Sequence, residues 1–199
     1  IFNETGIRLK HINLGGGFPV NYLREDSPAF PIEQSEMFSA DFEPATAVQN
    51  AWNIVSKAAD NQNASHLLDD ITLLLEPGRS IIADAGICLT TVRNAKIRPV
   101  SETADHRPLT TDHWLMTDAG FNILLSMETY KWYYHLISAT RAGESHATTY
   151  KLAGPLCDGG DVYFDIEGMQ RLPDHRLLPE NVEPGEVLAA GGKVVTLLD

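Results

Sequence analysis

Three short stretches of the sequence combine glycine with residues that can do chemistry. GGGFP begins at Gly15, EPGR begins at Glu76, and GPLCDGGD contains Cys157 beside Asp158. Consecutive glycines let backbone N–H groups surround an anion, because no Cβ blocks its approach. A carboxylate and a guanidinium at the end of a buried strand are costly unless they pair or bind a ligand. A thiol in a glycine-rich loop is accessible, and an adjacent carboxylate favours a proton-donating thiol over a thiolate.

Each stretch also has a purely structural interpretation. The glycines could form a tight turn, and Arg79 could pair with Glu76. A lone cysteine is most often a small buried apolar residue, and Cys88, inside the apolar run GICLTTV, fits that description. The glycines match neither GxGxxG nor the GK[ST] of a P-loop, so an unrelated nucleotide-binding domain is disfavoured. Taken one at a time, the three stretches leave these alternatives open.

The elements that must position these stretches are of two kinds. Apolar runs at 10–14 and 69–75 predict strands of a buried parallel sheet, and helical spacing of apolar residues over 44–61 predicts a helix between them. This order is typical of a (β/α) barrel or a doubly wound sheet, whose sites lie at the carboxyl ends of the strands. Beyond these elements the sequence predicts a mostly antiparallel β domain with one helix at 122–138. Its β-rich segments are 80–92, 96–100, 113–116, 146–152, 162–164 and 187–190.

Composition limits the class of protein and its partners. The 199 residues carry a formal net charge of −12, which argues against nucleic acid and anionic membrane surfaces as partners. No run approaches the roughly 20 apolar residues of a transmembrane helix. The two cysteines and seven histidines lack metal-ligand spacing, so we predict no metal site. Without a disulfide framework, a cytoplasmic location is expected.

The order and spacing of four motifs indicate a family. GGGFP, EPGR, DAGFN at 118–122 and GPLCDGGDV together resemble the fold-type III pyridoxal-phosphate decarboxylases, which include the ornithine, diaminopimelate and arginine decarboxylases. The stretches GGGFPVNYL and YKWYYHLI most resemble the Y4yA-like branch. The resemblance implies the last strands of a PLP-binding (β/α)8 barrel over 1–83, followed by a C-terminal antiparallel β domain over 84–199. It also implies a C-terminal fragment that stops before the family's GAY motif.

The resemblance implies how the cofactor, pyridoxal 5′-phosphate, is held. Glu76 corresponds to the carboxylate that faces the pyridine nitrogen and keeps it protonated, so that the ring accepts the electrons left when carbon dioxide departs. No lysine of the chain has the family's Schiff-base setting, so that lysine is expected outside these residues. The residues that correspond to the family's phosphate contacts are Gly15, Gly16, Gly17, Gly78 and Arg79.

The resemblance also implies which residues contact an amino-acid substrate. Cys157 corresponds to the family's proton donor, and Asp118 and Asp158 correspond to contacts with the distal amine. In relatives Cys157 and Asp158 act across the interface of a homodimer with shared active sites. Ser126 and Met127 replace the segment in which diaminopimelate decarboxylases carry an arginine for a substrate carboxylate. We therefore expect meso-diaminopimelate to be disfavoured.

Two functional classes follow. The first is part of a PLP-dependent amino-acid decarboxylase, a carboxy-lyase that acts on a basic or diamino acid, with the isolated chain inactive. The second is a PLP-binding or structural relative that has lost catalysis. Glu76 and Cys157, both present beside intact glycines, favour the first class.

Overall fold

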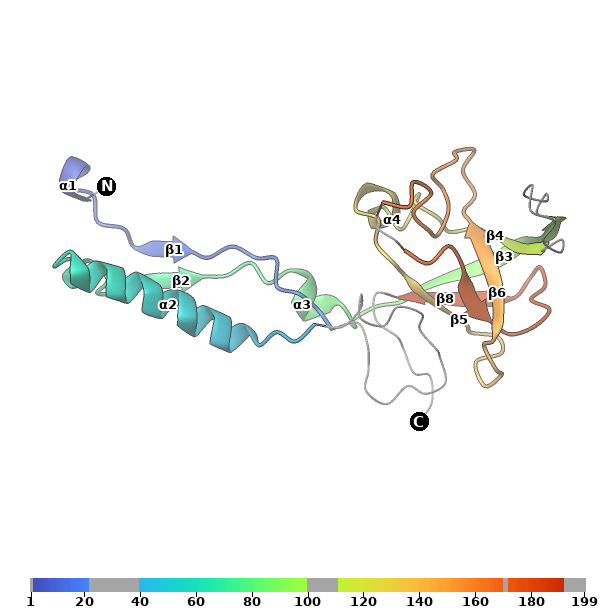
Figure 1. The fold of residues 1–199 in the computed structure, drawn as a ribbon, viewed down its shortest axis with the longest axis horizontal. Coiled ribbons are helices and arrows are strands. Elements are labelled where there is room, and N and C mark those ends of the chain that lie inside the picture. The colour runs from blue at the N-terminus through green and yellow to red at the C-terminus, as the bar shows by residue number, and fades with distance from the viewer. Residues whose placement is uncertain (1, 22–39, 100–110, 170–171, 192–199) are drawn as a thin grey trace, which may run out of the picture. The chain divides into compact units, whose positions relative to one another are not determined.

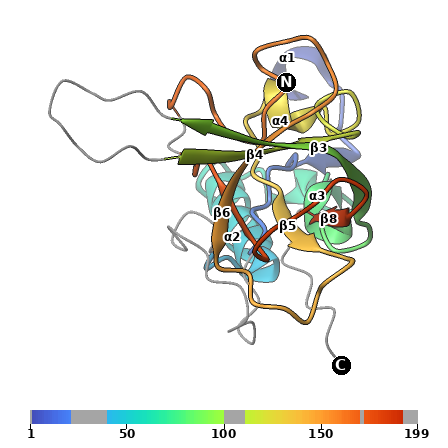
Figure 2. The ribbon, with the colours of Figure 1, turned by 90° about the vertical axis from the view of Figure 1, so that its right-hand side faces the viewer.

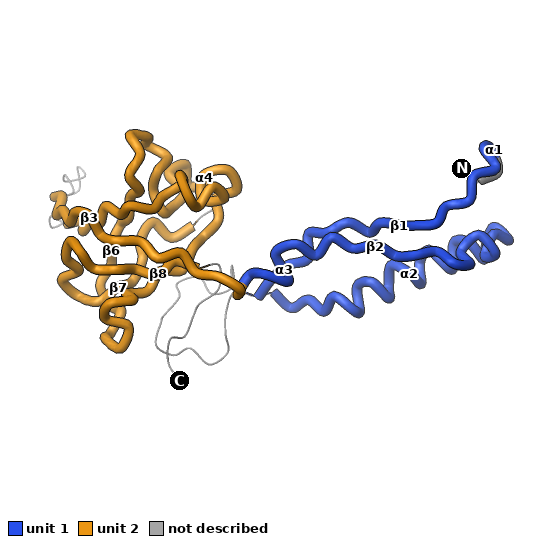
Figure 3. Tube along the Cα trace, turned by 180° about the vertical axis from the view of Figure 1, so that it is seen from behind, with its two compact units in different colours: residues 1–21, 39–83 blue, residues 22–38, 84–199 orange. Residues whose placement is uncertain are grey.

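The computed structural model describes residues 2–21, 40–99, 111–169 and 172–191, with element labels as in Figure 1. These residues fall into two units, coloured separately in Figure 3 and described separately below. The first unit holds the described residues up to Ala83, and the second holds those from Asp84 onward. No helix in the described ranges is long and apolar enough to cross a membrane.

The first unit is built on two short parallel strands and one long helix. β1 (His11–Asn13) pairs in parallel with β2 (Thr72–Leu74), as the two apolar runs predict, although neither strand has the buried residues that were expected. Between them lies α2 (Pro44–Asn61), which confirms the helix predicted from apolar spacing at the same bounds. Its first turn is stabilised by Pro44 and by the Glu43 carboxylate, which accepts the Ala45 N–H at 3.2 Å.

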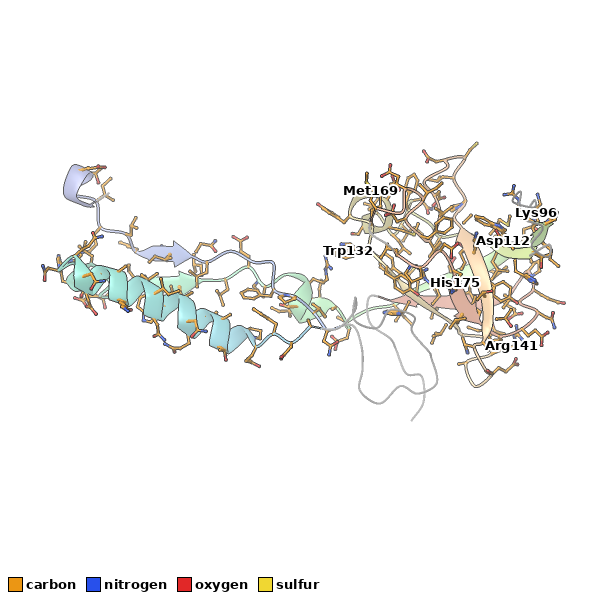
Figure 4. The ribbon with its side chains drawn as sticks, viewed as in Figure 1. Lys96, Asp112, Trp132, Arg141, Met169 and His175 are labelled. Atoms are coloured by element: carbon orange, nitrogen blue, oxygen red, sulfur yellow. The ribbon has the colours of Figure 1, made fainter. Side chains whose placement is uncertain are left out.

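Three short helical segments complete the first unit, and no residue in the ranges 4–21 and 40–83 is buried. These segments are α1 (Phe2–Thr5), the 3₁₀ turn η2 (Ser65–Leu67) and α3 (Arg79–Ile82). Side chains project from α2 on several sides (Figure 4), and none of its residues is buried. Ile54, for example, is 71% exposed. The described part of this unit therefore has no hydrophobic core of its own.

The second unit is a six-stranded sheet in the order β5-β8-β3-β4-β6-β7. All neighbouring pairs are antiparallel except β4 with β6, which confirms a mostly antiparallel β domain. Figure 2 shows the long strands β3 and β4 side by side. The strands are β3 (Cys88–Pro99), β4 (Thr111–Thr117), β5 (His135–Ser138), β6 (Thr148–Ala153), β7 (Arg176–Leu178) and β8 (Val187–Gly191).

The two edge strands of this sheet, β5 and β7, approach each other. Arg176 of β7 is only 3% exposed, and its Nε donates to the carbonyl of Tyr134, just before β5, at 2.8 Å. The guanidinium also lies over the ring of Tyr133, with 3.6 Å from Cζ to the ring centroid. A buried arginine is tolerated here because backbone carbonyls and an aromatic face replace its water.

The core of the second unit lies among these strands and the segments that connect β4 to β5, β6 to β7 and β7 to β8. Its fully or nearly buried members are Val92, Leu115, Leu124, Met127, Leu136, Tyr150, Leu152, Tyr163, Leu178, Val182, Leu188 and Ala190. Apolar burial of this kind is the main favourable term in folding.

The helix predicted over 122–138 is wrong. Only α4 (Ser126–Thr129) is helical there, and the end of the segment forms β5, all four of whose residues are buried. Lys131, at a positive φ of 53°, takes the chain out of the helical conformation between them. A buried strand and a helix produce similar apolar runs, so the pattern alone did not separate them.

The predicted strand bounds also need correction. The segment 80–92 begins in α3, and its strand starts only at Cys88. The segment 162–164 contributes an isolated bridge between Val162 and Ala153, and β6 starts at Thr148 rather than at residue 146. The segments 96–100 and 113–116 fall in β3 and β4, although residue 100 lies outside the described residues, and 187–190 falls in β8.

Candidate functional site

The carboxyl ends of β1 and β2 bring the triple glycine beside Glu76. Asn13 and Leu74 are register partners at the last position of each strand. The pairing continues one step beyond the strands, because the Leu14 N–H donates to the Leu74 carbonyl at 2.9 Å. The Glu76 N–H then donates to the Gly15 carbonyl at 2.8 Å. Parallel pairing therefore places two stretches that are far apart in the sequence next to each other.

Each of the three glycines is required for a local reason. Gly15 and Gly17 have positive φ angles of 75° and 77°, a conformation that L side chains rarely adopt. Gly16 lies against the backbone of Glu76, where a Cβ would overlap the Glu76 carbonyl oxygen. The loop thus needs backbone freedom at its ends and close approach at its centre.

Asn13 links the glycine loop to the Glu76 carboxylate. Its Nδ2 donates to Glu76 Oε1 at 2.7 Å, and its Oδ1 accepts the Gly15 N–H at 2.7 Å. An amide can do both, because one end donates and the other accepts. Sequence reasoning missed this residue, although a polar side chain at the last position of a strand was an available signal.

This arrangement fits an anion such as a phosphate beside an exposed carboxylate. The N–H groups of Gly16 and Gly17 make no hydrogen bond to any residue in the described ranges, so they can donate to an anion. Glu76 is exposed at the same strand ends and is oriented by Asn13. Gly78, at a positive φ of 49°, directly precedes Arg79, the first residue of α3.

Asp118 follows β4 in the second unit, and its carboxylate is fully engaged. Oδ1 accepts the Thr90 hydroxyl and the Thr91 N–H, both at 2.8 Å. Oδ2 accepts Nε and Nη2 of Arg93, at 3.1 and 2.8 Å. Hydrogen bonds hold the pKa of Asp118 below its usual range, first the one from the Thr91 N–H and then those from Thr90 and Arg93. A carboxylate has about four acceptor positions, so these four donors fill them.

The loop from Gly154 to Asp161 carries Cys157 and Asp158. Both residues are exposed, so the thiol of Cys157 is accessible. Asp158 Oδ1 accepts the Gly160 N–H at 2.7 Å, so this carboxylate shapes its own turn. The other cysteine, Cys88, packs against the core, and burial followed by the nearby Asp118 raises the pKa of its thiol.

The predicted site residues therefore form separate groups in the structure. The first unit brings the glycines and Glu76 together. The second unit holds Cys157 and Asp158 in one loop, whereas Asp118 is bound to β3. The roles predicted for these residues toward cofactor and substrate stay predictions.

The family model described as pyridoxal-dependent decarboxylase, C-terminal sheet domain, matches residues 28–191. The chain belongs to the pyridoxal-dependent decarboxylase family. Members of this family use pyridoxal phosphate, and the sheet domain of the description agrees with the second unit.

Individual decarboxylases of the family are similar along nearly all of the chain. Diaminopimelate decarboxylase of Escherichia coli strain K12 is 34% identical over 189 residues, which are 93% of this chain and 37% of that protein. A crystal structure of a diaminopimelate decarboxylase superposes with a TM-score of 0.60 at 31% identity, covering 96% of this chain and 38% of the other. The Methanocaldococcus jannaschii enzyme in complex with L-lysine gives 0.55 at 27% identity, covering 96% and 34%. The chain thus spans little more than a third of the length of these decarboxylases.

Proposed function

We propose that this chain supplies the phosphate-binding loop and the proton-donor loop of a PLP-dependent carboxy-lyase that acts on a basic or diamino acid. The observation that carries this function is the meeting of the triple glycine with Glu76 at the ends of β1 and β2. Membership of the family supports it, as do relatives that are diaminopimelate decarboxylases, one of them in complex with L-lysine.

The first unit would hold the cofactor. The N–H groups of Gly16 and Gly17 would donate to its phosphate, with Gly78 and Arg79 adding contacts. Glu76, oriented by Asn13, would keep a proton on the pyridine nitrogen. When bound, pyridoxal phosphate supplies the sink for the electron pair that remains when carbon dioxide leaves.

The second unit would complete the reaction. The Cys157 thiol would give its proton to the carbon that has lost carbon dioxide. Asp158, and Asp118 if Arg93 releases it, would attract the distal ammonium group of the substrate. Because Cys157 lies on an exposed loop, it is free to reach the site of a second copy, as expected for a homodimer.

A substrate panel tests the activity. The full-length gene product that contains this chain is supplied with pyridoxal phosphate, and carbon dioxide release is measured with lysine, ornithine, arginine and meso-diaminopimelate. Release from at least one basic or diamino acid is expected, with diaminopimelate a poor substrate because of Ser126 and Met127. A folded protein that binds the cofactor but releases no carbon dioxide from any of them would instead be a relative that has lost catalysis.

A further inference from the structure

A buried carboxylate, Asp161, stands at the base of the loop that carries Cys157. Asp161 is 1% exposed, and both of its carboxylate oxygens accept backbone N–H groups. Oδ2 accepts the N–H of Leu156, the residue directly before Cys157, at 2.7 Å. Oδ1 accepts the N–H of Phe121, in the turn after β4, at 2.8 Å. One side chain therefore joins the cysteine loop to a turn that is distant in sequence.

The backbone of Asp161 closes the same loop. Its carbonyl accepts the Gly154 N–H at 2.8 Å, and its N–H donates to the Asp158 carbonyl at 3.1 Å. The loop therefore begins and ends at hydrogen bonds to one residue, with Cys157 between them.

Two glycines make room for this carboxylate. A Cβ on Gly120 or on Gly154 would overlap the carboxyl group of Asp161. Both backbones thus approach the carboxylate as closely as the absence of a side chain allows. The DAGFN and GPLCDGGD motifs meet at Asp161, which accounts for a glycine in each.

The charge of Asp161 is balanced by the backbone rather than by a cation. No lysine, arginine or histidine within the described ranges forms an ion pair with it, so the two N–H groups are what make its burial tolerable. Two short hydrogen bonds to a buried acceptor rigidify the segments that donate them. Leu156 is one of these two donors, and Cys157 follows it directly.

We propose that Asp161 is a positioning residue that holds the Cys157 thiol in the geometry for proton donation. This role rests on the proposed function of Cys157. It predicts that Asp161 affects turnover through the thiol and not through cofactor binding.

A double-mutant cycle tests this role in the cofactor-loaded full-length gene product. Asp161→Asn keeps the shape but turns an NH₂ group toward one of the two N–H donors. We expect kcat to fall about ten-fold, with cofactor affinity unchanged. In a Cys157→Ala background the same substitution should change kcat less than about two-fold, because the group that it positions is gone. Asp165→Asn is the matched control, since Asp165 is also buried and its carboxylate accepts the Glu167 N–H at 3.1 Å, outside the 154–161 loop.

The outcomes separate the two proposals. If the fold-losses in kcat from Asp161→Asn and Cys157→Ala multiply in the double variant, Asp161 has a general structural role. The inference about Asp161 is then overturned, while the donor role of Cys157 stands. If Cys157→Ala alone leaves rate and product unchanged, the donor role of Cys157 falls and the role of Asp161 falls with it.

Amide hydrogen exchange in the unmodified protein gives an independent measurement if Asp161→Asn does not fold. Leu156 is 41% exposed, so its N–H should exchange quickly unless Asp161 protects it. Slow exchange at Leu156 is expected. Exchange at the rate of an open loop would overturn the inference.

Discussion

The carbonyl oxygen of Glu76 occupies the space that a Cβ on Gly16 would need. The side chain of Glu76 is at the same time held by Asn13, so the backbone and the side chain of one residue are both fixed at the glycine loop. In the proposed function, phosphate binding by the loop and ring binding by Glu76 are therefore coupled, because a change at the loop also displaces the carboxylate.

Gly16→Ala should weaken cofactor binding. The added methyl group collides with the backbone of Glu76, so the loop must move away from the position in which its N–H groups face a phosphate. We expect the Kd for pyridoxal phosphate to rise at least about ten-fold, as measured by absorbance titration. Gly86→Ala is the control, because Gly86 has open space at its Cβ position. Equal affinity in both variants would contradict phosphate binding by this loop.

Glu76→Gln should cost more activity than Cys157→Ala. In the proposed function the carboxylate supports the electron sink in every turnover, so we expect a loss of about 10³-fold in kcat. Removal of a proton donor costs about 10²-fold and should also divert part of the product, with cofactor still bound. Rates are compared by carbon dioxide release and products by mass spectrometry. An equal or smaller loss for Glu76→Gln would refute the role of Glu76.

Arg93→Ala tests whether Asp118 binds the ammonium group of a substrate. The substitution frees Oδ2 of Asp118, which the guanidinium now occupies. If a substrate ammonium binds Asp118, KM for a basic amino acid should fall by up to about five-fold, the equivalent of one exposed ion pair. Arg98→Ala, on the same strand, is the control. An unchanged KM would indicate that Asp118 serves only to bind β3.

Acidic pH should destabilise the second unit through His135. Burial, and then the nearby Arg176, lower the pKa of His135 to about 3. The unfolded chain takes up this proton below a pH of about 6.5, whereas the folded protein does not. The stabilisation is therefore complete above that pH and is lost as pH falls toward 3, by up to about 1.4 kcal/mol per pH unit.

Urea unfolding at several pH values between 7.5 and 4.5 measures this loss. His135→Phe should have a shallower pH dependence than the wild type, because the ring that must be protonated on unfolding is gone. His66→Gln, at an exposed histidine, should leave the slope as in the wild type. Parallel slopes for all three proteins would contradict a depressed pKa at His135.

Local patterns in the sequence predicted those parts of the fold that depend on local physics. Apolar spacing gave the bounds of α2, and short apolar runs gave β1 and β2 together with their parallel pairing. Glycines after a strand indicated a special loop, and the structure supplies the separate reason for each one. These features follow from side-chain periodicity and from the conformational freedom of glycine.

Such local patterns do not predict contacts between segments that are distant in the sequence. The segment 122–138 reads as helical, but pairing with β8 makes its end a strand. The three-residue strand β7 begins with the buried Arg176, a residue type normally expected at the surface. The engagement of Asp118 by Arg93 and the closure of the cysteine loop by Asp161 likewise need the folded sheet.

These residues are proposed to serve a cofactor that is bound covalently elsewhere in the same gene product. Borohydride reduction of the full-length gene product with pyridoxal phosphate, followed by peptide mapping, tests it most directly. We predict a label on a lysine upstream of Ile1, and none on the six lysines of this chain, Lys10, Lys57, Lys96, Lys131, Lys151 and Lys193. A label on one of those six, or no label in a folded protein supplied with cofactor, would contradict the claim.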